Sequence, residues 1–406
     1  MRSVDEHRAA VVALISAALP PVTVSLSDAL GRVLAADVVA AVDLPGFDNS
    51  AMDGYAVRSA DVVDASAASP VVLEVDGDIA AGDTRRHVLR PGATMRIMTG
   101  APLPEGADAI VPVEASDGGV SRVALNLAAE TGRHLRRQGE DVRTGDVVLR
   151  AGTHVGPGQV ALAAASNVAE LSVAAKPRVS IMSTGDELML PGQSLQYGQI
   201  VDSNSVMLAA LATASGADVM GSGHLNDDAE AMAALLGDMP GQPDLILTTG
   251  GVSMGAYDTV KEVLSGTGTV EFVKVAMRPG MPQGAGVVGE RRTPIITLPG
   301  NPVSSFVSFH VFVLPALRAL AGLDPEIATI ESVAAQGWSS IEGKAEFTRV
   351  VVDADGARPS GGQGSHMLGA LADATHLAVV DAETTQIRPG DTVHLLPLVG
   401  QDWPCP

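Results

Sequence analysis

Short apolar runs that each end in a cluster of polar residues recur along this chain. Apolar residues predominate in Val179–Met182, Leu245–Leu247 and Ile296–Leu298, and each run is followed by glycine together with Thr, Asn or acidic residues. A continuous apolar run of this length is typical of a strand that is buried on both faces of a parallel sheet. Because ligands bind at the carboxyl edge of such a sheet, we expect these polar loops to form a site.

Other stretches show the spacing of helices. Apolar residues recur at helical intervals up to about Ala41, in the alanine-rich stretch Gly158–Ala165 and in Val303–Leu320. From Pro177 to about Ala321, helical segments alternate with the apolar runs, and this alternation predicts an α/β layer fold.

Short strands separated by turn residues occupy two further regions. From Pro45 to about Glu140, apolar segments alternate with Gly, Pro and Asp, which predicts a small β domain. After Gly322 the strand signals return, at Phe347–Val352, Leu377–Val380 and Thr392–Leu396. The expected fold class is therefore a multidomain α/β plus β protein, with a three-layer α/β domain and two smaller β domains.

Length and charge narrow the range of functions. The chain has 406 residues, enough for two to four domains, and a formal net charge of -21. Nucleic-acid binding requires a basic face, so a general affinity for nucleic acid is excluded. An anionic ligand would have to be held by a local cluster of cations against the overall field.

The single cysteine and the N-terminus bear on the location of the protein. Cys405 stands alone near the end of the sequence, so no disulfide framework or thiolate metal site can form. The first seven residues include acids and a histidine, and the apolar run after them is short. We expect an amphipathic helix rather than a signal peptide or a membrane span, and therefore a cytoplasmic protein.

The run FDNSAMDGYAVR, Phe47–Arg58, concentrates acids, Asn and Ser in a few positions. Such residues also form ordinary surface turns, because their side chains bond to the local backbone. Here the run passes directly into the apolar strand start Tyr55–Val57, and a loop tied to a strand can hold carboxylates in fixed positions. We therefore interpret it as a binding loop.

Several motifs together resemble one family. The motifs are FDNSAMDGYA, RIMTGAPLPEGADAIV, RRQGED, STGDEL, TTGGVSMG followed by Asp258, RPG, LPGNPVS and GQGSHML. They occur in the order seen in the molybdopterin molybdenumtransferases, the MoeA and gephyrin E-domain family. The resemblance spans roughly Ala35 to Leu371, and ordered motifs are far more specific than any one of them.

The resemblance implies a reaction and an assembly. The family takes adenylylated molybdopterin and molybdate, cleaves the adenylate in a Mg²⁺-dependent step, and releases AMP and molybdenum cofactor. It implies a homodimer of four-domain subunits, with the adenylyltransferase of the same pathway as a candidate partner. The implied domains are a discontinuous dimerisation domain of mixed structure (1–44 and 140–175), a small β domain (45–139), an α/β molybdopterin-binding domain (176–323) and a C-terminal β domain (324–406).

The resemblance also assigns the metal ligands. Asp53, Glu187 and Asp258 fall on positions that the family uses near the metal and the cleft, and carboxylates are suitable hard ligands for Mg²⁺. Asp141 and Asp227 are carried over to the substrate site. For each acid the alternative is loop capping or a helix N-cap.

The substrate-binding residues carried over from the family are mostly small or rigid. Glycine lets backbone N–H groups face an anion without interference from a Cβ atom, and proline stiffens a loop. These residues are Thr99, Gly100, Thr184, Gly185, Gly250, Gly251, Ser253, Pro299, Asn301, Pro302 and Ser365.

Lys274 and Arg278 are the cations that the resemblance assigns to the bound oxyanions. A lone lysine is usually a solvated surface charge, and this is the alternative for Lys274. The chain departs from the common KPGKP pattern, because it has Arg278 at the first position and Met281 at the fourth. The arginine keeps the charge and gains a planar fork, whereas Met281 removes a cation.

Two other functions remain open from the sequence. The α/β segment alone resembles a molybdopterin adenylyltransferase, although the flanking β domains argue against that activity. A non-catalytic binding or scaffold paralogue is the third hypothesis, and retention of the acids at Asp53, Glu187 and Asp258 favours catalysis over it.

Overall fold

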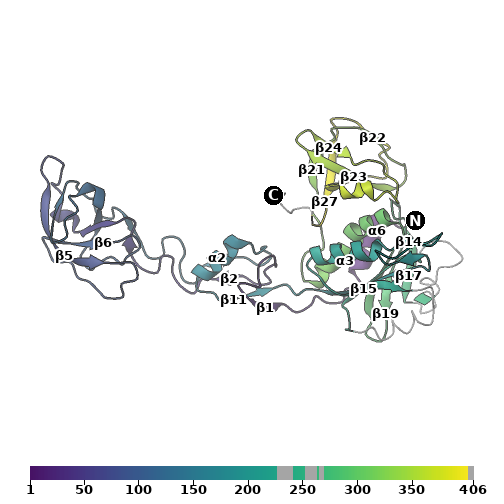
Figure 1. The fold of residues 1–406 in the computed structure, drawn as a ribbon, viewed down its shortest axis with the longest axis horizontal. Helices are drawn as coiled ribbons and strands as arrows, with labels where there is room; N and C mark the ends of the chain where they lie inside the picture. The colour runs from purple at the N-terminus through teal and green to yellow at the C-terminus, as the bar shows by residue number, and fades with distance from the viewer. Residues whose placement is uncertain (226–240, 252–262, 265–268, 401–406) are drawn as a thin grey trace. The chain divides into compact units, whose positions relative to one another are not determined.

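The computed structural model describes residues 1–225, 241–251, 263–264 and 269–400. The chain divides into two compact units, one made of Met1–Val22 and Ala174–Pro406 and the other of Thr23–Val173. Each unit is described by itself (Figure 1).

A mixed sheet forms the centre of the first unit. Its strand order is β15-β12-β16-β20-β19-β17, in which β15, β12, β16 and β20 are parallel and β19 is antiparallel to both of its neighbours. The strands are β12 (Arg178–Thr184), β15 (Asp218–Leu225), β16 (Leu245–Thr249), β17 (Val270–Lys274), β19 (Pro282–Val288) and β20 (Thr293–Leu298). The three apolar runs therefore form neighbouring buried strands, as predicted, and their carboxyl ends meet at one edge.

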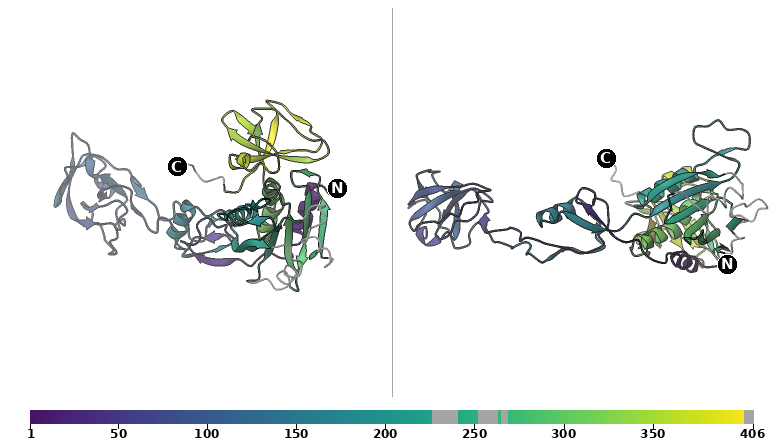
Figure 2. Two further views of the ribbon diagram at one scale, coloured as in Figure 1. Left: turned by 45° about the vertical axis from the view of Figure 1, so that its right-hand side comes forward. Right: turned by 90° about the horizontal axis from the view of Figure 1, so that it is seen from below.

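Helices pack against this sheet (Figure 2). They are α1 (Val4–Val12), α3 (Asn204–Ala214), α6 (Pro302–Ser308) and α7 (Leu314–Leu320), with a π-helical turn, η3 (Phe309–Val313), between the last two. The predicted helix Val303–Leu320 is thus confirmed with a π-turn inside it. Pro302–Leu320 is long and apolar enough to cross a membrane, but 83% of its apolar window is buried, as is typical of a core helix.

A second sheet follows in the same unit. Its order is β18-β23-β25-β27-β21, and β24 pairs with β23. Its strands are β18 (Met277–Arg278), β21 (Ile330–Val333), β23 (Ala345–Asp353), β24 (Gly356–Pro359), β25 (His376–Val380) and β27 (Thr392–Pro397). Smaller elements are β13 (Leu188–Met189) paired with β14 (Ile200–Val201), β22 (Trp338–Ser339) paired with β26 (Gln386–Ile387), and α8 (Gly369–Ala372).

One hydrophobic core joins the two sheets of this unit. It contains Leu247 of the first sheet, Phe312 of the π-turn and Leu377 of the second sheet, each fully buried. In addition, β18 pairs in parallel with β23, so the segment between β17 and β19 is hydrogen-bonded to the C-terminal sheet.

The other unit contains a five-stranded sheet of order β7-β4-β6-β5-β8. These strands are β4 (Gly54–Val57), β5 (Val71–Ile79), β6 (Ala93–Ile97), β7 (Ala109–Pro112) and β8 (Arg122–Leu125). The remaining elements are β1 (Val22–Ser25), β2 (Val38–Val39), β3 (Asn49–Ser50), β9 (Leu135–Arg136), β10 (Val147–Leu149), β11 (Glu170–Val173), α2 (Pro157–Ala165) and the short helices η1 (Ser59–Asp61) and η2 (Val113–Ala115).

The helical prediction for the N-terminal region is correct only for its first part. A capping box between Ser3 and Glu6 starts α1, but the helix ends at Val12. Pro20 and Pro21 then prevent helix propagation, and the β-branched residues that follow favour the strand β1. Ala29, which has a helical spacing to Val33, is instead buried with Leu34 beside α2 and β11.

Candidate functional site

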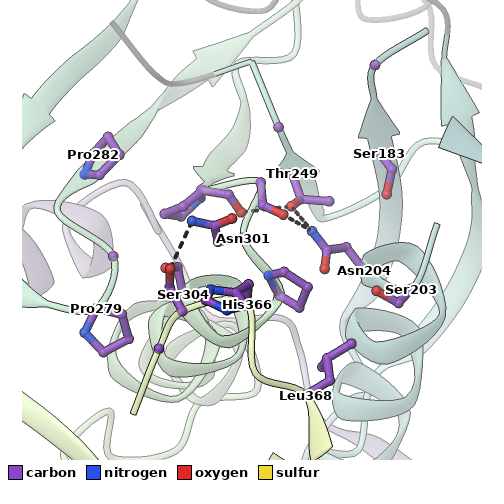
Figure 3. Close-up of a pocket in the computed structure, with 18 of the residues that line it drawn as sticks. Ser183, Ser203, Asn204, Thr249, Pro279, Pro282, Asn301, Ser304, His366 and Leu368 are labelled. Carbon is purple, nitrogen blue, oxygen red and sulfur yellow. Dashed lines mark hydrogen bonds between the residues drawn. The ribbon is translucent and has the colours of Figure 1, made fainter. Parts of the chain in front are cut away.

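A cleft of about 1370 Å³ lies at the carboxyl edge of the first sheet (Figure 3). Its walls include the loops that follow β12, β16 and β20, together with the segment Met277–Pro282. Residues of the C-terminal β region, among them Gln363–His366, complete the described lining. The polar loops that the sequence placed at one edge therefore surround one cavity.

The loop after β12 depends on a glycine. Gly185 has a φ of +144°, and a Cβ atom there would lie 2.6 Å from Glu187 Oε2. The Glu187 carboxylate thus folds back over the loop. Glu187 is exposed and lines the cleft. After this loop the chain forms the short strands β13 and β14 before it reaches α3.

Hydrogen bonds hold the loops after β16 and β20 together. Asn204, at the start of α3, donates from Nδ2 to Thr249 Oγ1 at 3.0 Å and to the Gly300 carbonyl at 2.8 Å. Thr249 Oγ1 also donates to the Pro299 carbonyl at 3.0 Å. Gly250 has a φ of +93°, and a Cβ atom there would approach the Thr184 carbonyl to 2.6 Å. Position 250 therefore has little room for any residue except glycine.

Two hydrogen bonds connect the C-terminal β region to the cleft. Asn301 Nδ2 donates to Ser365 Oγ at 3.0 Å, and the Val303 backbone N–H donates to the Ser365 carbonyl at 3.1 Å. Ser365 is therefore fixed at the cleft wall although it is distant in sequence from the α/β region.

The described lining contains few charges. The acids are Glu187 and Asp202, the permanent cations are Arg278 and Lys344, and His366 is exposed beside them. Arg278 Nη1 lies 3.4 Å from Glu346 Oε1, and the Arg278 side chain is 42% exposed whereas that of Glu346 is 5% exposed. Arg278 thus keeps part of its guanidinium available to the cleft, since only one carboxylate contacts it among the described residues.

Met281 also lines the cleft and is half-buried. Its backbone carbonyl accepts a hydrogen bond from the Val275 N–H at 2.8 Å. The side chain provides apolar surface at the position where the resembling family carries a lysine.

Asp53 lies in the other unit, directly before β4, and is exposed. Its Oδ1 accepts hydrogen bonds from the Thr99 backbone N–H at 2.6 Å and from the Thr99 hydroxyl at 2.8 Å. These two hydrogen bonds hold the pKa of the Asp53 carboxyl below its usual range, so the group is anionic at neutral pH.

The residues expected from the sequence fall into distinct groups. Those that line the cleft are Thr184, Gly185, Glu187, Gly250, Gly251, Arg278, Pro299, Asn301, Pro302 and Ser365. Those in the other unit are Asp53, Thr99, Gly100 and Asp141. Lys274 is exposed at the end of β17 and is not among the lining residues. Asp227, Ser253 and Asp258 lie outside the described residues.

The sequence did not point to several lining residues, including Asp202, Asn204 and Lys344. Asp202 is 1% exposed, and its Oδ1 accepts from Ser183 Oγ and from the Ser205 backbone N–H, both at 3.0 Å. One signal was present, since polar residues stand directly before an apolar helix that begins at Asn204.

The carboxylates at the cleft have the chemistry of a Mg²⁺ site, but no complete ligand set lies within the described residues. There, His, Cys, Asp and Glu side chains nowhere gather in a group of three. Glu187 lines the cleft, and its carboxylate has no hydrogen bond to another described residue. A hard carboxylate oxygen in an open cleft fits one ligand position of Mg²⁺.

Family models match three parts of the chain. They are the MoeA N-terminal region (domain I and II) at residues 2–166, a probable molybdopterin binding domain at residues 180–319, and the MoeA C-terminal region (domain IV) at residues 331–398.

Individual proteins are similar over nearly the whole chain. Molybdopterin molybdenumtransferase 2 of Mycobacterium tuberculosis strain H37Rv is 47% identical over 399 residues, which cover 96% of this chain and 98% of that protein. The molybdopterin molybdenumtransferase of Bacillus subtilis strain 168 is 35% identical over 394 residues, covering 94% and 91% respectively. The crystal structure of the molybdopterin biosynthesis MoeA protein of Pyrococcus horikoshii OT3 matches with a TM-score of 0.82 at 28% identity, covering 98% of this chain and all of that one.

The sheets and the cleft, together with these matches, define a multidomain protein of the MoeA type with an α/β molybdopterin-binding domain. The chain belongs to the molybdopterin molybdenumtransferase family.

Proposed function

We propose that this protein inserts molybdate into adenylylated molybdopterin, with hydrolysis of the adenylate, to give molybdenum cofactor and AMP. The observation that carries the proposal is the cleft at the carboxyl edge of the sheet, where glycine turns lie beside Arg278. Backbone N–H groups in such turns and a partly exposed guanidinium are suited to bind phosphate and molybdate oxygens. Family relatives that match almost the full chain carry the corresponding name.

The cleft residues have proposed roles in binding. Gly250 and Gly251 offer backbone donors to the pyrophosphate link, and Arg278 attracts the oxyanion. The other proposed substrate contacts are Thr99, Gly100, Asp141, Thr184, Gly185, Asp227, Ser253, Lys274, Pro299, Asn301, Pro302 and Ser365.

Asp53, Glu187 and Asp258 would hold Mg²⁺ in this proposal. Support comes from the hydrogen bonds that keep Asp53 anionic and from the open position of Glu187 in the cleft. Bound there, Mg²⁺ would neutralise charge on the pyrophosphate and assist departure of AMP. The protein residues would orient the substrate for attack at the reacting phosphate.

The proposed assembly is a cytoplasmic homodimer, in which the small β domain of one subunit completes the cleft of its partner. The division into 1–44 with 140–175, 45–139, 176–323 and 324–406 is part of this proposal. Mixing an Asp53→Asn variant with an Asp258→Asn variant should restore activity through hybrid dimers if subunits exchange. A monomer by light scattering at micromolar concentration would contradict the assembly.

The direct test of the reaction is to supply adenylylated molybdopterin, molybdate and Mg²⁺ and to follow AMP release. We expect release that requires all three components. Binding of molybdopterin without any AMP release would instead support the scaffold function.

A further inference from the structure

Arg349 is a fully buried arginine that lies behind the cleft wall. It belongs to β23 and is 1% exposed. Its guanidinium makes no ion pair with a described carboxylate, and burial lowers the pKa of the group. An arginine buried without a counterion is costly unless its donors are satisfied by other groups.

One short loop satisfies the donors of Arg349. Its Nη1 donates to the Met367 carbonyl at 2.8 Å, and its Nη2 donates to the carbonyls of Gly362 at 2.6 Å and Gly364 at 3.3 Å. The arginine therefore connects several turns of the loop 362–367 through a single rigid fork.

Gln363 completes the clamp between this loop and β23. Its Oε1 accepts from the Arg349 backbone N–H at 3.1 Å, and its Nε2 donates to the Arg349 carbonyl at 3.2 Å. The loop itself is rich in glycine and contains no helix or strand between β24 and α8. Because glycine has high conformational freedom, this loop needs external contacts to keep one shape.

The same loop brings Ser365 to the cleft. Ser365 accepts hydrogen bonds from Asn301 Nδ2 and from the Val303 backbone N–H, which belong to the loop after β20 and to α6. Gln363, Gly364 and Ser365 all line the cavity. A continuous set of hydrogen bonds thus runs from the buried guanidinium to a cleft residue.

We infer that Arg349 is a positioning residue, which holds the loop 362–367 so that Ser365 and Asn301 present their polar groups to the bound substrate. Arg349 does not line the cleft itself. The inference rests on the proposed function for its kinetic consequence, but the ordering of the loop does not depend on that function.

The test compares Arg349→Met, Arg349→Lys and a matched control, Arg358→Met. Arg358 lies on the neighbouring strand β24, is 48% exposed in its side chain, and pairs with Asp353 at 3.1 Å. We measure amide hydrogen exchange along the chain and the steady-state kinetics of AMP release at varied molybdate.

We expect Arg349→Met to accelerate exchange in 360–368 and 301–304, with β25 and β27 unchanged. The molybdate concentration for half-maximal turnover should rise about tenfold or more, and kcat should fall much less. Arg349→Lys keeps the charge and some donors, so both the faster exchange and the rise in the molybdate concentration should be smaller than in Arg349→Met. Arg358→Met should change neither quantity.

Uniformly faster exchange throughout the C-terminal sheet, or unchanged exchange in 360–368, would overturn the inference. If Arg349→Met does not fold, the same comparison with Arg349→Lys decides it, because the lysine cannot bridge all three carbonyls. Absence of turnover in the parent protein would count against the proposed function alone, since the exchange data would still report on the loop.

Discussion

Asn204 and Thr249 are joined by a buried hydrogen bond of 3.0 Å, although 45 positions separate them in the sequence. The same Asn204 amide reaches the Gly300 carbonyl at 2.8 Å. The first residue of α3 therefore fixes the loops after β16 and β20 relative to each other, and with them two walls of the cleft.

Replacement of Asn204 by Leu should destabilise the protein and weaken substrate binding. The change removes the amide donor from the buried Thr249 hydroxyl and from the Gly300 carbonyl, which costs on the order of 1–3 kcal/mol in the free energy of unfolding. Urea denaturation measures this loss. Ser203→Ala is the control, because the neighbouring Ser203 makes no capping hydrogen bond to α3. Equal stability of Asn204→Leu and the parent would contradict this role.

Asp53→Asn, Glu187→Gln and Asp258→Asn should each preserve folding and reduce AMP release by about ten- to a hundredfold, because an amide is a poorer Mg²⁺ ligand than a carboxylate. Raised Mg²⁺ should restore part of the activity. Asp186→Asn serves as the control, since Asp186 is next to Glu187 but does not line the cleft. Parent rates in all three variants would show that the metal assignment is wrong.

Arg278→Ala should raise the molybdate concentration needed for half-maximal turnover, whereas Met281→Lys should lower it. The Coulomb attraction between a cation and a nearby oxyanion in a partly screened site contributes on the order of a few kcal/mol to the binding free energy, before the cost of desolvation is subtracted. Molybdate titrations of the parent and both variants measure the effect.

The double variant Arg278→Ala with Glu346→Gln separates anion binding from loss of the Arg278–Glu346 ion pair. It should show the same rise in the molybdate concentration for half-maximal turnover as Arg278→Ala. If Met281→Lys has no effect while Arg278→Ala is impaired, Arg278 alone serves the oxyanion and Met281 is a packing substitution.

His310 should make the stability of the protein depend on pH. Its Nδ1 bonds to the Phe306 carbonyl at 2.9 Å, and its Nε2 accepts from the Val399 N–H at 3.1 Å, so the neutral ring fits this site. Desolvation lowers the pKa of His310 from its ordinary 6.5 to about 4. The unfolded chain therefore binds more protons between these values, and stability should fall as the pH drops from about 6.5 to about 4.

The loss from His310 alone should be on the order of 3 kcal/mol at the acid end of this range. Urea unfolding at several pH values measures it, with His310→Gln and the exposed His394→Gln as paired variants. The His310 variant should show a smaller pH dependence than the parent, and the His394 variant should match the parent. An unchanged pH dependence in His310→Gln would contradict the account.

The strands that position the cleft could be predicted because burial on both faces leaves a clear sequence signal. Leu245–Leu247 is apolar throughout and Ile296–Leu298 is apolar except for Thr297, and parallel neighbours place the carboxyl ends of these strands together. The polar loops that follow these strands could therefore be recognised as one group from the amino-acid sequence.

The remaining parts depend on tertiary contacts that periodicity does not encode. Lys344 and Gln363 line the cleft beside β23, and the pairing of β23 with β18 joins residues far apart in the chain. Lys274 has the spacing of a cation beside Arg278, yet it ends β17 at the edge of the sheet and is exposed. Apolar spacing alone likewise could not show that the chain after Val12 leaves the helix, since strands and helices both bury such residues.

The most direct test of the central claim is the amount of molybdenum that the protein transfers to molybdopterin. The purified protein is incubated with adenylylated molybdopterin, molybdate and Mg²⁺, and molybdenum bound to the pterin product is measured together with AMP. We predict equal amounts of the two products for the parent protein and much less of both for Arg278→Ala at limiting molybdate. AMP release without any molybdenum on the pterin, or no product of either kind, would contradict the assignment of this cleft as a site of molybdenum insertion.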